Sequence, residues 1–133
     1  MSKWNNFDCA NRVREILSDA VYGDGGHHLG KPFLTPYQIA LEFAERWPED
    51  FEEMNLPIGG IGLGEKTSLA QYFGGQISQR IESGELSDFE GGFISNSHLV
   101  KMEFVDNQKH PVVSSKTSSG HDLSMFRLKD KNQ

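Results

Sequence analysis

Residues 66–81 carry side chains that can read the base edges of duplex DNA. Glutamine can pair with adenine through two hydrogen bonds, arginine can pair with guanine in the same way, and serine can bond to either base. This stretch has two basic residues and no acidic one. The residues that we predict to contact DNA here are Lys66, Ser68, Gln71, Tyr72, Gln76, Gln79 and Arg80. A solvated polar helix face is the competing interpretation.

A second group of basic residues lies in the C-terminal part of the chain. Residues 99–129 hold five lysines and arginines against three acids, and residues 114–119 are serine, threonine and lysine only. Lysine and hydroxyl side chains are suited to phosphate oxygens. We therefore predict that Lys101, Lys109 and Lys116 contact the DNA backbone; an exposed turn of small residues is the alternative.

Two glycine-rich features accompany the candidate DNA-reading segment. The loop GGIGLGEKT at 59–67 resembles a phosphate-binding P-loop, but Glu65 separates the last glycine from Lys66, and no buried strand precedes it. We expect either a turn or a seat for one DNA phosphate at the start of the next helix. Gly74 and Gly75 each cost that helix about 1 kcal/mol relative to alanine. They predict a helix break or the close approach of another backbone, another helix or DNA.

The acidic residues gather elsewhere. Ten of the nineteen acids fall within 42–53 and 82–90. The first group offers a contact for a basic partner, or a face turned away from DNA, whereas the plainer interpretation is a solvated helix face. The candidate partner-binding residues are Glu45, Glu49, Asp50, Glu52 and Glu53.

The sequence contains no recognisable catalytic or metal-binding constellation. Cys9 is the only cysteine, and no base can be assigned to it. His27 and His28 are adjacent, so their side chains diverge unless the loop bends, and the sequence lacks the hydrolase, zinc-protease and deaminase signatures. We expect no enzyme activity, no metal and no cofactor.

Composition favours one soluble domain. The chain has 133 residues, a net charge of -6 and no apolar run that could cross a membrane or act as a signal peptide. We expect a cytoplasmic protein with a single domain over 1–133 and an ordered core over about 7–128. The net charge excludes a general basic coat for nucleic acid.

The hydrophobic periodicity changes from about 3.6 to 2 along the chain, which predicts an α+β fold. Helices are expected over 7–22 with a stop at Gly23, from a capping box at Thr35 and Gln38, in a short turn over 48–54, and from a second capping box at Ser68 to Gly84. Strands are expected over 91–96, 99–105, 112–116 and 123–128, with turns at 106–109 and 117–120. The predicted architecture is a three-helix bundle followed by a C-terminal β-hairpin or three-stranded meander.

This order of elements resembles a winged helix-turn-helix domain. The resemblance rests on FLTPYQIA at 33–40, SLAQY at 68–72 and LSMFRL at 123–128, and covers about 7–128. It implies double-stranded DNA binding, with helix 68–82 in the major groove and the hairpin as the wing, in a transcription regulator or an accessory factor of a DNA-handling system. Winged helices also serve as protein-interaction modules. The alternative function is therefore an immunity factor or inhibitor that uses the acidic second helix.

Overall fold

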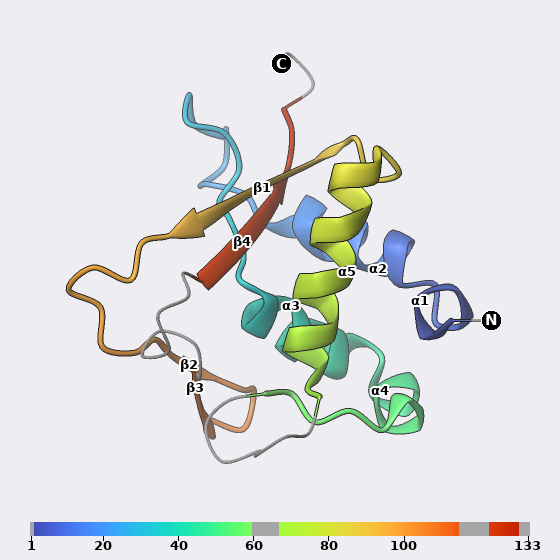
Figure 1. Cartoon of the computed structure of the whole chain (residues 1–133). Helices are drawn as coiled ribbons and strands as arrows, with labels where there is room; N and C mark the ends of the chain where they lie inside the picture. Colours follow the sequence, from blue (N-terminus) through green and yellow to red (C-terminus); the bar gives the residue numbers. More distant parts are fainter. Residues whose placement is uncertain (1, 60–66, 115–122, 131–133) are drawn as a thin grey trace.

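The computed structural model describes residues 2–59, 67–114 and 123–130. Its helices are α1 (Lys3–Asn6), α2 (Cys9–Asp19), α3 (Pro36–Arg46), α4 (Pro48–Met54) and α5 (Leu69–Ser83). Its strands are β1 (Phe89–Ile94), β2 (Glu103–Val105), β3 (Pro111–Val113) and β4 (Leu123–Leu128). The α+β class is therefore confirmed, with the helices in the first part of the chain (Figure 1).

Local capping signals begin the two longer helices that follow the first loop. The Thr35 side chain accepts from the amide of Gln38, the Gln38 side chain accepts from the amide of Thr35, and Pro36 takes the first helical position. Ser68 caps α5 by accepting from the amide of Gln71, and Gly84 ends it with a φ of 88°. The starts of α3 and α5, and the stop at Gly84, are therefore confirmed.

The first helical region differs from the prediction of one helix over 7–22. Asp8 adopts a left-handed conformation with a φ of 52°, which separates α1 from α2, and α2 ends at Asp19 before the expected stop at Gly23. Trp4, only 1% exposed, belongs to the core, which thus begins before residue 7. The spacing of Val13, Ile16, Leu17, Ala20 and Val21 predicts one apolar stripe on this helix. The first three are buried on α2, whereas Ala20 is half-buried and Val21 is 57% exposed, both beyond the end of the helix.

The strands do not form the expected sequential meander. β1 pairs antiparallel with β4, from Phe89 opposite Leu128 to Ile94 opposite Leu123, and β2 pairs antiparallel with β3 as a separate hairpin. Leu34 adds an antiparallel bridge to Phe126 on the other edge of β4. The meander was predicted from the alternation of apolar residues in segments that are neighbours in the sequence. β1 contains Gly91 and Gly92, which weaken this alternation, and it pairs with β4, which is distant in the sequence.

The two strands of the β2–β3 hairpin, which lies between β1 and β4 in the sequence, are shorter than predicted. Residues 99–102 lie outside β2. β3 covers 111–113, and Ser114 lies outside it, while residues 115 and 116 of the predicted strand 112–116 are not among the described residues. The turn at 106–109 is confirmed, since the Lys109 amide donates to the carbonyl of Asp106. The predicted turn at 117–120 lies outside the described residues.

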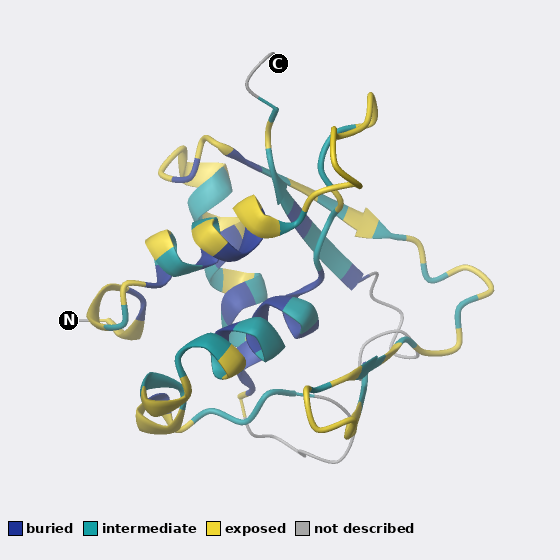
Figure 2. Ribbon diagram, turned by 180° about the vertical axis from the view of Figure 1, so that it is seen from behind, coloured by how far each residue is buried: buried dark blue, intermediate teal, exposed yellow. Residues whose placement is uncertain are grey.

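Aromatic side chains fill the centre of the core. Trp4, Phe43, Phe73 and Phe89 are each at most 1% exposed. Phe73 meets Trp4 and Phe43 edge to face, with ring centroids 6.5 and 5.4 Å apart. The helices turn their buried sides inward, while α4 and the loop after α2 are largely exposed (Figure 2). None of the helices in the described ranges is long and apolar enough to span a bilayer.

Candidate nucleic-acid interface

Helix α5 presents a polar stripe outward that carries no charge from Gln71 to Gln79 and is followed on the same face by the exposed Glu82. Gln71, Gly75, Ser78 and Gln79 are exposed and follow the i, i+4, i+7, i+8 spacing of one helix face. Phe73 and Ile77 on the opposite side are fully buried. We call these four residues the outward face of α5, and the helix runs along the near side of the molecule in Figure 1.

The Gly74–Gly75 pair does not break the helix. A Cβ on Gly74 would lie 3.3 Å from Cγ of Pro36, so this glycine lets the start of α3 pack closely against α5. A Cβ on Gly75 would have no neighbour within 4 Å. The close approach of another helix therefore explains Gly74, which contacts the start of α3. Gly75 leaves a position without a side chain in the outward face of α5.

Two of the predicted DNA-contacting residues are engaged within α5. Ser68 is 7% exposed and its hydroxyl accepts from the amide of Gln71 at 3.0 Å. Gln76 is half-buried, and its Oε1 accepts from Nε of Arg80 at 3.2 Å. Ser68 therefore serves the helix start, and Gln76 helps to fix Arg80.

Arg80 and Tyr72 turn toward α1 and not toward the outward face. Arg80 forms a 2.5 Å ion pair with Glu85, and its guanidinium lies 4.7 Å from the ring centroid of Trp4. Tyr72 is half-buried and hydrogen-bonded to the backbone of Trp4, and burial is the main cause of its raised pKa. The structure thus separates both residues from Gln71 and Gln79.

The other arginines are also held in ion pairs. The chain has five arginines, and every one of them bonds to at least one carboxylate. The pairs are Arg12–Asp50, Arg14–Asp88, Arg46–Asp19, Arg46–Glu42, Arg80–Glu85 and Arg127–Glu90. An arginine that reads guanine would first have to leave its carboxylate.

The lysines are placed differently from the arginines. Lys101 and Lys109 are exposed, and both lie on the stretch between β1 and β4. Lys66 and Lys116 lie outside the described residues, as do 115–119 of the hydroxyl-rich segment. Ser114, the first residue of that segment, is 2% exposed, and its Oγ accepts from the amide of Met102 at 3.0 Å. This serine is therefore a structural link in the β2–β3 hairpin.

No known family model, curated protein or solved structure matches this chain.

Most of the acidic candidates remain on the surface. Glu45, Glu49, Glu52 and Glu53 are exposed on α3 and α4. Asp50 instead forms a 2.6 Å ion pair with Arg12, whose guanidinium lies 4.8 Å from the ring centroid of Trp47. Asp50 thus holds α4 against α2, and the four glutamates are the part of this set available to a partner.

Residues with possible catalytic or metal-binding chemistry are dispersed. Cys9 is buried, and burial raises the pKa of its thiol to about 12. His27 and His28 have ring centroids 4.1 Å apart, and Nδ1 of His27 accepts from the amide of Leu29. Within 2–59, 67–114 and 123–130, no three histidine, cysteine or acidic side chains gather as a metal site would require.

Sequence reasoning missed a groove between α3, α4 and the β2–β3 hairpin, with a volume of about 690 Å³. Leu41, Phe51 and Phe104 are among the side chains that line it, and all three are only half-buried. The available signal was Leu41, an apolar residue that lies off the buried stripe of α3. No local sequence pattern predicts that the β2–β3 hairpin lines this groove, because its position depends on tertiary packing.

Proposed function

We propose that the chain is a winged-helix module that binds duplex DNA through the outward face of α5. The observation that carries this proposal is the composition of that face. From Gln71 to Gln79 it offers amide and hydroxyl groups and no carboxylate. Such groups can bond to base edges in the major groove, which is wide enough for an α-helix.

The connectivity supports the winged-helix interpretation. Leu34 bridges to β4 between α2 and α3, and β4 in turn pairs with β1, which follows α5. A bridge residue before the second main helix and two paired strands after the third correspond to the positions of the three strands of a winged helix. In this interpretation the residues between β1 and β4 take the place of the wing beside the recognition helix.

The charge distribution limits the number of phosphate contacts. Because the arginines are paired, the basic side chains that we assign to phosphates are lysines, with Lys101 and Lys109 exposed. Each lysine–phosphate contact contributes about 0.9 to the slope of log affinity against log salt. The expected binding is therefore modest in affinity, with a shallow salt dependence.

The test is a mobility-shift or filter-binding titration on mixed duplex DNA over a series of salt concentrations. Gln71→Glu and Gln79→Glu each place a carboxylate on the outward face and should weaken binding at least about tenfold. Ser18→Glu adds the same charge on exposed α2 and serves as the matched control. Lys101→Ala should reduce the salt slope by about 0.9.

The DNA proposal has clear failing results. Absence of binding at low salt would remove it. Equal losses in Ser18→Glu and Gln79→Glu would show that net charge, and not the outward face of α5, controls the interaction. Arg80→Ala is unsuitable as the main variant because Arg80 also holds Trp4 and Glu85.

The second candidate function is a protein-interaction module, such as an inhibitor or immunity factor for a basic partner. The favouring observation is the exposure of Glu45, Glu49, Glu52 and Glu53 on α3 and α4. Reversal of Glu49, Glu52 and Glu53 to lysine should abolish co-purification of such a partner. Retention of the partner by the triple variant would exclude this surface as the contact.

A further inference from the structure

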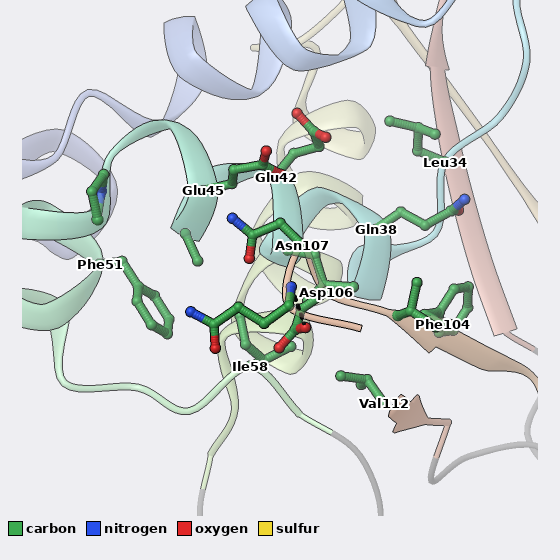
Figure 3. Close-up of a pocket in the computed structure, with 15 residues that line it drawn as sticks. Leu34, Gln38, Glu42, Glu45, Phe51, Ile58, Phe104, Asp106, Asn107 and Val112 are labelled. Atoms are coloured by element: carbon green, nitrogen blue, oxygen red, sulfur yellow. Dashed lines mark hydrogen bonds between the residues drawn. The ribbon is translucent and has the colours of Figure 1, made fainter. Parts of the chain in front are cut away.

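The groove between α3, α4 and the β2–β3 hairpin has the size of a binding site. Its volume of about 690 Å³ lies within the range of about 300–1,000 Å³ that is usual for ligand pockets. Side chains from both helices and from the hairpin converge on it (Figure 3). The groove lies on the α3–α4 side of the molecule, which comes to the front in Figure 2, whereas α5 is in front in Figure 1.

The interior of the groove offers apolar contact. Leu41 of α3, Phe51 of α4 and Phe104 of β2 line it, together with Val112 of β3. These four side chains are half-buried, so each retains apolar surface that a bound group could cover. Large apolar anchors such as leucine or phenylalanine suit a lining of this kind.

The charges of the groove have one sign. Glu42 and Glu45 line it from α3, and Asp106 lines it from the hairpin turn. None of the described lining residues is a lysine, arginine or histidine. Glu42 already bonds to Arg46 at 2.9 Å and Asp106 accepts from the amides of its own turn, whereas Glu45 is exposed. A cation entering the groove would thus find Glu45 the most accessible carboxylate.

Both walls of the groove are held in place without a ligand. The rings of Phe104 and Tyr37 stack with centroids 5.4 Å apart, which ties β2 to α3. Asp106 accepts from the amides of Gln108 and His110 at 2.9 and 2.8 Å, which closes the hairpin turn. The free-energy cost of ordering the groove when a ligand binds should therefore be small.

We propose that this groove binds a cationic, amphipathic segment of a partner protein, with apolar side chains in the groove and lysine or arginine beside Glu45. The three carboxylates disfavour a DNA backbone at this position. A second copy of the chain is also disfavoured, because its net charge is -6. The inference gives the protein-interaction candidate a specific site and does not depend on DNA binding by α5.

The probe is a random-peptide display library selected on the full chain, with affinities of the enriched peptides measured by fluorescence anisotropy. The expected peptides combine lysine or arginine with leucine, phenylalanine or tryptophan. Glu45→Lys should weaken their binding at least about fivefold, since it replaces an attraction by a repulsion. Glu15→Lys makes the same charge change on exposed α2, outside the groove lining, and should leave affinity within about twofold.

A second measurement locates the peptide. Backbone amide signals of Leu41, Phe104 and Val112 should shift on titration, and Glu45→Gln should weaken binding less than Glu45→Lys. The proposal is overturned if no peptide is enriched, if the enriched peptides are acidic or uncharged, or if Glu15→Lys weakens binding as much as Glu45→Lys. Gln71→Glu should leave peptide affinity unchanged, so the peptide and DNA proposals can fail separately.

Discussion

Alanine substitution should stabilise the fold at Gly75 but not at Gly74, although the two glycines are adjacent in one helix. Both substitutions gain about 1 kcal/mol of helix propensity, because glycine loses more backbone freedom on folding than alanine does. At Gly75 a Cβ would meet nothing within 4 Å. Gly75→Ala should therefore raise the free energy of unfolding by about 1 kcal/mol.

At Gly74 the added methyl group would meet the start of α3. Its Cβ would lie 3.3 Å from Cγ of Pro36, a ring atom that cannot rotate away, and Pro36 follows the Thr35 cap directly. Overpacking of this kind costs about 1–3 kcal/mol, which equals or exceeds the propensity gain. Gly74→Ala should therefore be neutral or destabilising, about 2 kcal/mol below Gly75→Ala.

Urea-induced unfolding of the two variants and the unchanged chain measures this difference. The reasoning assumes that the slope of free energy against urea is the same for all three proteins, which the titrations also report. Equal stabilisation by both substitutions would refute the close contact between α5 and Pro36. Gly75→Ala carries a second readout, because a stabilised variant with weaker DNA binding would indicate close approach of DNA to this glycine.

Three further results are expected. Arg127 lies with its guanidinium 4.2 Å from the Phe33 ring centroid and donates to the carbonyls of Leu29 and Lys31. Arg127→Ala should therefore lower stability by about 1–3 kcal/mol and increase chymotryptic cleavage after the exposed Leu29. If cleavage after Leu29 stays unchanged, this anchoring role is wrong. Native Cys9 should resist alkylation at pH 8, because burial raises its pKa to about 12; rapid labelling without unfolding would contradict this. The hydrogen bond from Arg14 lowers the pKa of Asp88 below its usual 3.8. The interaction therefore stabilises the fold at pH values above 3.8, and this stabilisation is lost as the pH falls through the lowered pKa of Asp88. Asp88→Asn should reduce the loss of stability measured by urea unfolding between neutral pH and pH 3, and an unchanged loss would exclude the linkage.

Helix starts and stops could be predicted from the sequence because their signals are local. The Thr35 capping box and the glycine at the end of α5 each need only a few neighbouring residues. The pairing of β1 with β4 could not be predicted in this way. Gly91 interrupts the apolar alternation of β1, and a Cβ there would lie 3.3 Å from the Phe126 ring, so the glycine makes room for a distant residue.

The same division between local and distant signals applies to the candidate site. The four-residue spacing of Leu69, Phe73, Ile77 and Ile81 predicts the inward side of α5. Of the polar residues off this stripe, the structure exposes Gln71 and Gln79 but leaves Tyr72, Gln76 and Arg80 half-buried. The placement of Arg80 and Asp50 depended on partners in other elements. Arg80 lies against Trp4, and Asp50 bonds to Arg12, and neither contact leaves a periodic pattern in the sequence.

The ion pairs explain how one acidic chain can offer two surfaces of different character. Pairing of the arginines with carboxylates leaves lysines such as Lys101 and Lys109 as the exposed cations between β1 and β4, while Glu45 and its neighbours on α4 stay exposed on the α3–α4 side. Phosphates are repelled by the glutamates, so a duplex should approach the α5 side and not the α3–α4 side. A cationic protein segment has the opposite preference. The two proposed ligands should therefore bind at the same time, and a complex in which each displaces the other would argue that they share one surface.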